Sequence, residues 1–177
     1  PMAVADVFAA LKERFPGMNW EPQPLVRYLD GRASDQLCVT FLPIRLLEVM
    51  RFLHDDPRCR FDLLADLAGI DYLNYPGADD RFAVVYNIVS VPHNHRLWVK
   101  VFVNDPQPTL PSVTGIWQGA NWPEREVYDM FGITFAGHPD LRRILCEEFF
   151  EDHPLRKDYP LRGKGERENF PVLTRES

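Results

Sequence analysis

Two acidic side chains, Glu126 and Asp129, are three residues apart in a segment whose apolar residues recur at helical spacing. Residues at this spacing share one face of a helix, where a buried pair of carboxylates could act as general acid and general base. The chain shows no serine, histidine and aspartate set, nor another recognisable nucleophile with its base. Because helical carboxylates usually serve the helix dipole or ion pairs, a stand-alone enzyme for an anionic substrate is kept only as an alternative.

Histidine and cysteine side chains offer a second kind of chemistry, metal binding. His138, Cys146 and His153 are close in the sequence, and His93 and His95 form an HxH pair near the end of an apolar stretch. Structural zinc takes four ligands and catalytic zinc usually three plus water, at spacings that this chain does not show. The three cysteines also lack a CxxC motif. We therefore expect no metal site, and an isolated metal-binding module is kept as an alternative.

The C-terminal part of the chain repeats one short phrase. Both "HPDLRR" and "HPLRK" combine a His-Pro step, a leucine and two adjacent basic residues. Residues 137–177 are rich in charge of both signs and poor in aliphatic side chains, so this segment cannot bury enough apolar surface to fold alone. Extended segments with proline lose little entropy on binding, and arginine binds carboxylates through paired hydrogen bonds. The sequence therefore predicts a compact domain at 1–136 and an extended docking tail at 137–177.

The composition limits the class of protein. The chain has 177 residues, 45% of them hydrophobic, which suits one domain with a real core. A formal net charge of −6 argues against a general binder of nucleic acid or anionic membranes, because such binding needs a basic surface. No stretch approaches the roughly 20 apolar residues that span a bilayer, and the first residues do not resemble a signal peptide. We expect a cytoplasmic or peripheral protein.

The first part of the chain is expected to contain two helices, a strand and a further helical stretch. Apolar residues recur at helical spacing over residues 3–15, and their alternation over residues 37–41 indicates a strand. Pro43 is expected to open the second helix. Residues 61–68 are also expected to be helical. The inward-facing residues of the second helix are expected to be Ile44, Leu47, Met50 and Leu53.

The clearest elements are two stretches rich in β-branched and aromatic residues, "RFAVVYNIVSV" and "RLWVKVFVN". The short polar link "PHNH" between them predicts an antiparallel hairpin. Residues 109–131 return to helical spacing, with Ser112 and Asn121 as the expected caps of two successive helices and Gly132 as the stop of the second. The expected fold is α+β, with a mixed or antiparallel sheet packed by helices on one face and an extended proline-rich C-terminal tail. In the second strand Leu97, Val99, Val101 and Val103 share one face, opposite Trp98, Lys100 and Phe102, and one of these two faces is expected to pack on helices.

The segment "NWPEREVYDMFGITFAGHPDLRRIL", followed by "HPLRKDYPL", resembles the signature of the C-type, 30 kDa subunit of the respiratory NADH:quinone oxidoreductase, complex I. The resemblance is dense over residues 110–162 and looser over residues 61–103, where "LADLAGIDYL" and "FAVVYNIVS" follow the family's order of elements. Asp152 departs from the pattern, because the family usually has glycine before the second His-Pro step. That departure raises the question of whether the turn needs a positive φ.

The resemblance implies a non-catalytic structural subunit in the hydrophilic arm of a proton-translocating NADH:quinone oxidoreductase. It packs on the D-type subunit, which helps to form the quinone site, and on the adjacent B-type subunit, which carries an iron–sulfur cluster. The resemblance implies no cofactor in this chain, since the iron–sulfur clusters, FMN and quinone belong to partner subunits. It also implies a peripheral location on the cytoplasmic side of the inner or plasma membrane, which the chain meets only indirectly, through the complex. The nearest alternative is the homologous subunit of a membrane-bound hydrogenase or a deazaflavin-dependent dehydrogenase.

The resemblance also implies which residues dock. Arg142 and Arg143 are expected to bind a partner carboxylate, and reversing both charges is expected to leave the domain folded. The helix positions expected to fix the contact surface are Trp122, Glu124, Arg125, Glu126 and Asp129. The positions expected to form the docking track along the tail are His138, Asp140, Arg142, Arg143, His153, Arg156, Lys157 and Asp158.

Overall fold

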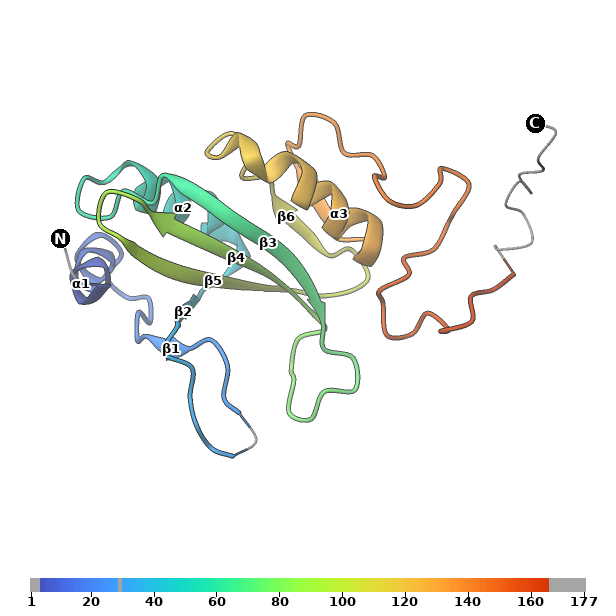
Figure 1. Ribbon diagram of the computed structural model, residues 1–177, viewed down its shortest axis with the longest axis horizontal. Helices are drawn as coiled ribbons and strands as arrows, with labels where there is room; N and C mark the ends of the chain where they lie inside the picture. Colours follow the sequence, from blue (N-terminus) through green and yellow to red (C-terminus); the bar gives the residue numbers. More distant parts are fainter. Residues whose placement is uncertain (1–3, 29, 166–177) are drawn as a thin grey trace.

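The computed structural model describes residues 4–28 and 30–165, which form an α+β fold (Figure 1). Five strands build a mixed sheet in the order β1-β2-β5-β4-β3, and β6 and β7 form a separate small sheet. The strands are β1 (Gln23–Pro24), β2 (Leu37–Thr40), β3 (Leu63–Asp71), β4 (Phe82–Ser90), β5 (His95–Val103), β6 (Thr109–Pro111) and β7 (Thr134–Ala136). The helices are α1 (Val4–Arg14), α2 (Leu46–Asp55) and α3 (Asn121–Phe131), with short 3₁₀ helices η1 (Pro43–Arg45) and η2 (Gln118–Ala120).

The hairpin of β4 and β5 forms the centre of the large sheet. The two strands pair antiparallel along their whole length, and β5 pairs on its other side with β2 in parallel. The inward-facing residues of all three helices belong to the same hydrophobic core as one face of this hairpin. The predicted α+β class, the mixed sheet and the hairpin are therefore confirmed. Side chains of β5 that are at most 7% exposed are Leu97, Val99, Val101 and Val103.

The segment predicted to be helical at residues 61–68 belongs largely to β3, so that prediction is wrong. β3 is an edge strand that pairs antiparallel with β4, with an irregularity after Leu64. The spacing of its apolar residues fits a short helix and an edge strand about equally. The neighbouring strand β4 favours the strand, because it supplies hydrogen-bond partners along the length of β3. Gly69 lies inside β3. A Cβ at this position would lie 2.6 Å from the ring of Phe131, so glycine allows α3 to approach the sheet.

Two successive helices are predicted over residues 109–131, and only the second of them forms an α-helix, which begins at Asn121. The prediction of the first helix is wrong. Thr109–Pro111 instead form β6, which pairs in parallel with β7. Asn121 is the first residue of α3 and not its cap. Ser112 is not a helix cap either, because its hydroxyl donates to the carboxylate of Glu124 at 2.6 Å. The local sequence predicts Ser112 as a helix cap, but its hydroxyl forms a hydrogen bond with a carboxylate twelve residues away.

The C-terminal end of α3 and the start of α2 follow the sequence more closely. Gly132 caps α3 directly after Phe131, as predicted, and the φ of this glycine is 76°, in the left-handed region. Pro43 begins η1 before α2, and the tighter 3₁₀ turn changes the direction of the next side chain. Ile44 is consequently 86% exposed, and its predicted inward position is wrong. The residues of α2 that do pack inward include Leu47, Met50 and Leu53.

After β7 the chain continues beside α3 without a further helix or strand up to residue 165 (Figure 1). We call residues 137–165 the strap. Residues 147–150 form one hydrogen-bonded turn, in which the Phe150 N–H donates to the carbonyl oxygen of Glu147 at 3.0 Å. Residues 166–177 of the predicted tail lie outside the described residues, and the division of the chain after residue 136 stays a prediction. No helix of the described chain combines the length and apolar character needed to cross a membrane.

Candidate functional site

The buried carboxylate of Asp129 is the main contact between α3 and the strap. Its Oδ2 accepts the backbone N–H groups of Ile144 (3.0 Å), Leu145 (2.7 Å) and Cys146 (2.9 Å). Its Oδ1 accepts a hydrogen bond from Nη1 of Arg143 at 2.7 Å. Burial alone would raise the pKa of Asp129, but these four donors favour the ionised form and lower the pKa below its ordinary value. The strap therefore folds around a permanent buried anion.

The second His-Pro step lies against the end of α3. Nδ1 of His153 donates to the carbonyl oxygen of Asp129 (2.9 Å), and Nη2 of Arg143 donates to the carbonyl oxygen of Asp152 (3.0 Å). The imidazole lies over Gly132, where an added Cβ would be 2.7 Å from the ring. Asp152 is not among the residues with positive φ, so the turn does not require the glycine that the family usually has there.

A ring of four charges attaches the end of the strap to the sheet. Arg81 binds Asp105 and, at 2.7 Å, Asp158, while Arg156 binds Asp105 at 3.0 Å and Asp158 at 3.5 Å. Both guanidinium groups also lie over the ring of Phe82, with their carbons 4.7 and 4.9 Å from its centroid. A hydrogen bond from Arg81 lowers the pKa of Asp158. Each of these partly exposed pairs alone contributes little, but the closed network fixes three segments to one another.

Several residues predicted to contact a partner hold the strap to its own domain. Arg125 of α3 donates to the carbonyl oxygens of Arg142 (3.1 Å) and Arg143 (3.0 Å). Lys157 donates its backbone N–H to the buried carboxylate of Asp71 at 2.8 Å. Each of these contacts lies within the chain, so partner binding by the predicted docking track stays a prediction.

Two of the predicted docking residues and one further residue of the strap have exposed side chains. Trp122, in the first turn of α3, is 70% exposed. The side chain of Arg142 is 68% exposed and pairs with Asp140 through its Nε at 2.9 Å. Leu145 is 64% exposed, although its backbone N–H is bound to Asp129. Tryptophan and arginine are enriched at protein interfaces, so these side chains have the composition of a contact surface. We call Trp122, Arg142 and Leu145 the outer patch.

The arrangements considered from the sequence for catalysis and for metal binding are not assembled. Glu126 is exposed whereas Asp129 is fully buried, so the two do not form a buried acid–base pair. His138, Cys146 and His153 do not converge on one point. Within residues 4–28 and 30–165, no group of three or more His, Cys, Asp or Glu side chains is placed to hold a metal ion.

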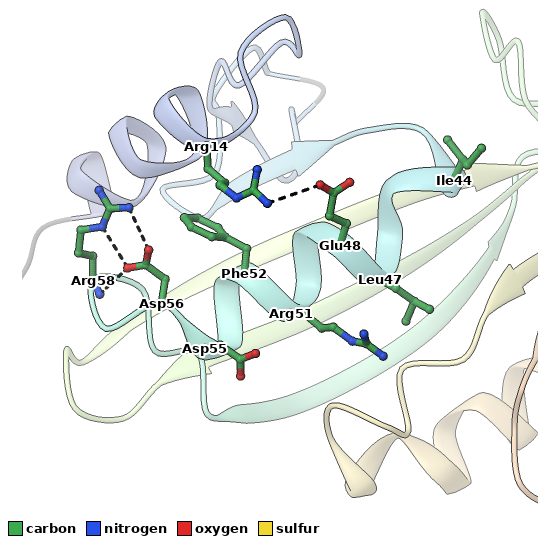
Figure 2. A pocket seen from close by; sticks show the side chains of 9 residues that line it. All are labelled: Arg14, Ile44, Leu47, Glu48, Arg51, Phe52, Asp55, Asp56 and Arg58. Atoms are coloured by element: carbon green, nitrogen blue, oxygen red, sulfur yellow. Dashed lines mark hydrogen bonds and ion pairs between the residues drawn. The ribbon is translucent and has the colours of Figure 1, made fainter.

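A surface hollow of about 790 Å³ lies between α1 and α2 (Figure 2). Arg14 reaches toward Glu48, with 3.9 Å between Nη2 and Oε1, and Arg58 pairs with Asp56 at 2.9 Å. The apolar part of the lining includes the exposed Ile44. Three arginines and three acidic residues line the hollow, so its charge selects no class of ligand. None of the predicted docking residues contributes to it.

Sequence reasoning missed the residues that receive the strap. Asp71, Arg81 and Asp105 bind strap residues that are distant in the sequence, up to 86 positions away, so no local spacing indicates these pairs. The resemblance implies that Glu124 is one of the helix positions that fix the contact surface. Glu124 lies in the first turn of α3, but it is fully buried and accepts hydrogen bonds from the Ser112 hydroxyl and the Val113 N–H. Burial raises the pKa of Glu124 to about 7, and these two hydrogen bonds offset part of that rise.

Comparison with known proteins adds independent findings. The family model described as the 30 kDa subunit of respiratory-chain NADH dehydrogenase matches residues 39–165, which include α3 and the strap. The chain is 52% identical over 125 residues to the C-type subunit of NADH-quinone oxidoreductase from Roseiflexus sp. (strain RS-1), a match that covers 71% of this chain and 70% of that one.

Two solved structures are similar to the chain. One is the trypsin-resistant fragment (1-134) of Nqo5, with a TM-score of 0.61 and 37% identity, covering 78% of this chain and 98% of that one. The other is a chain of the membrane-bound sulfane sulfur reductase, an archaeal respiratory membrane complex. It has a TM-score of 0.69 over 97% of this chain and 94% of that one, but at 20% identity it shows a common fold alone.

Proposed function

The chain belongs to the 30 kDa subunit family of respiratory-chain NADH dehydrogenase, complex I, and on this premise we propose that it acts there as a non-catalytic structural subunit. In this role it docks on the D-type subunit, which helps to form the quinone site, and braces it together with the B-type iron–sulfur subunit. We call these two partners the quinone-site subunit and the iron–sulfur subunit. FMN, the iron–sulfur clusters and quinone are held by partner subunits. The assembled protein lies peripherally, on the cytoplasmic side of the membrane.

The observation that carries this proposal is the fixed position of the outer patch. Asp129 binds the backbone of residues 144–146, and Arg125 binds the carbonyl oxygens of residues 142 and 143. These bonds order the strap before any partner arrives, so docking there loses less conformational entropy than docking of a free arm. Trp122 and Arg142 are the kinds of residue that dominate binding energy at interfaces.

The same contacts argue against an enzyme that acts alone on an anionic substrate. The carboxylate of Asp129 is already bound by four donors and cannot serve as a base without disrupting the strap. Arg143 and Arg156 are paired with carboxylates of their own chain and are therefore not free to bind an anion. The strap supports a structural role more directly than a catalytic one.

The test is affinity purification of the tagged full chain from its native host under mild extraction, followed by mass spectrometry. We expect the unmodified chain to bring down the quinone-site and iron–sulfur subunits. The double variant Trp122→Ala, Arg142→Glu should lose most of them, because two anchors at one interface are removed. Tyr28→Ala, which removes a 53% exposed aromatic side chain far from α3 in the sequence, is the control and should retain them. Circular dichroism checks that each variant is folded.

Two results would contradict the proposal. If the double variant retains the quinone-site and iron–sulfur subunits at the yield of the unmodified chain, the outer patch does not dock. If the unmodified chain brings down no iron–sulfur assembly, the structural role in complex I is wrong. The electron-input proteins in the same eluate separate complex I from a membrane-bound hydrogenase or a deazaflavin-dependent dehydrogenase.

A further inference from the structure

Glu124 is a fully buried carboxyl group that no cation of the described residues neutralises. Ser112 Oγ donates to its Oε2 at 2.6 Å, and the Val113 N–H donates to its Oε1 at 2.7 Å. Within residues 4–28 and 30–165, no arginine or lysine forms an ion pair with it, and Nε2 of His138 lies 4.0 Å from Oε2. A buried charge without a partner is costly, so Glu124 stays fully ionised near neutral pH only if a neighbouring group carries a positive charge.

Two hydrogen bonds fix the tautomer of His138, the titratable residue that the strap contributes here. Its Nδ1 accepts the backbone N–H of Asp140 at 3.0 Å and therefore carries no proton. Its Nε2 holds the ring proton and donates it to the carbonyl oxygen of Asn121 at 3.0 Å. The imidazole is neutral in this arrangement, because a proton on Nδ1 would break the bond from Asp140. His138 thus brings no positive charge to Glu124.

Tyr86 is the titratable residue that β4 places near the same carboxyl. Its Oη is buried and has no hydrogen-bond partner among the described residues. Burial, and then the negative charge of Glu124, raise the pKa of Tyr86 well above its ordinary value, so its hydroxyl stays neutral. Neutral groups therefore surround Glu124 on the sides of the sheet and the strap. Binding a proton is the remaining way to remove the buried charge.

A short series of hydroxyl groups connects Glu124 with the outside. Ser112 Oγ lies 2.6 Å from Oε2 and 2.8 Å from Oγ1 of Thr114, and Thr114 is partly exposed. With Glu124 ionised, Thr114 donates to Ser112 and Ser112 donates to Glu124. With Oε2 protonated, Glu124 donates to Ser112 and Ser112 donates to Thr114, and no heavy atom has to move. From this geometry we infer that Glu124 is a proton-binding site and that Ser112 and Thr114 pass the proton between it and solvent.

The inference goes beyond the structural role in the complex and depends on no partner. One O–H bond forms at Oε2 on proton uptake and breaks on release, and the hydroxyl groups of Ser112 and Thr114 each gain one proton and give one up. Since burial raises the pKa of Glu124 to about 7, the site exchanges its proton near neutral pH.

The test is infrared difference spectroscopy of the full chain as a function of pH. We expect the carbonyl band of a protonated carboxylic acid to disappear with a midpoint near pH 7, and Glu124→Gln to abolish it. Glu126→Gln, on the exposed side of the same helix, should retain the band. Ser112→Ala removes a hydrogen bond that favours the ionised form and should raise the midpoint by about one pH unit. Thr114→Val should leave the midpoint nearly unchanged but slow the response of the band to a rapid pH change.

Each result decides one part of the inference. A band that persists in Glu124→Gln, or that is absent at neutral pH in the unmodified chain, overturns the site. A response of Thr114→Val as fast as that of the unmodified chain overturns the relay. If Glu124→Gln does not fold, NMR of the Glu124 carboxyl carbon in the isotopically labelled unmodified chain decides. A midpoint near the ordinary 4.5 contradicts the inference, and one near 7 supports it.

Discussion

Replacing Asp129 with asparagine is expected to lower the free energy of unfolding by about 3–5 kcal/mol, the range for breaking a buried ion pair by removing one partner. The amide oxygen of asparagine can still accept the three backbone N–H groups of residues 144–146. Its NH₂ group then faces the guanidinium of Arg143, and because both groups are hydrogen-bond donors, the bond between them is lost. The mostly buried positive charge of Arg143 also loses its counter-ion. Chemical denaturation followed by circular dichroism measures the change.

The matched control is Glu126→Gln on the same helix. Because Glu126 is exposed, this substitution should change the free energy of unfolding by less than about 0.5 kcal/mol. An equal effect of the two substitutions would contradict the role assigned to the Asp129 carboxylate.

The effect of Asp129→Asn should also depend on pH, with a sign fixed by the pKa. The folded protein holds the pKa of Asp129 below the ordinary 3.8. The stabilisation is therefore fully present above that ordinary value and is lost as the pH falls through the lower folded-state pKa. The stabilities of the unmodified chain and the variant should converge in strong acid. A difference that stays constant down to the lowest pH at which both fold would show that ionisation of Asp129 is not its cause.

Gly132→Ala is expected to lower the free energy of unfolding by about 2–4 kcal/mol, more than a change of one methyl group suggests. Part of the loss, about 1–2 kcal/mol, is the cost of the left-handed backbone for a residue with a Cβ. The rest arises because the new Cβ would lie 2.7 Å from the His153 ring, which must leave the end of α3. Displacing His153 also breaks its bond to the carbonyl oxygen of Asp129, so trypsin should cleave the strap faster.

The chain offers a close control for this substitution. Gly137 has a φ of 81°, like the 76° of Gly132, but an added Cβ there would meet nothing within 4 Å. Gly137→Ala therefore measures the backbone cost alone. In addition, Gly132→Ala should cost less in a His153→Ala background than in the unmodified chain, because the colliding ring is gone. Equal costs at the two glycines, together with strict additivity with His153→Ala, would refute the packing role of Gly132.

How far the sequence predicts the fold depends on whether an element is determined locally. The β4–β5 hairpin and the end of α3 were predictable because alternation, a short polar link and a glycine stop act within a few residues. β3 was not, because its apolar spacing fits a helix as well as a strand and the neighbouring strand decides. The prediction that Ser112 caps a helix failed for the same reason, since the partner of Ser112 is a carboxylate twelve residues further along the chain.

The candidate site shows the same limit. The residue types of α3 and the strap indicated a protein-binding region. From them, both Arg142 and Arg143 were expected to bind a carboxylate of a partner. The structure separates them: the side chain of Arg143 is 13% exposed and binds Asp129, whereas that of Arg142 is 68% exposed. Which of two neighbouring arginines turns inward depends on the position of a buried carboxylate fourteen residues away, and periodicity carries no information about that distance.

The direction of the chain gives the Asp129 contacts a consequence for protein synthesis. The helix that carries the carboxylate leaves the ribosome before residues 143–146, which supply its donors. Until these residues are made, the Asp129 carboxylate has none of its four donors, and water must solvate it. The contact between α3 and the strap can therefore form only after this part of the chain has been synthesised, as a late step that needs no partner.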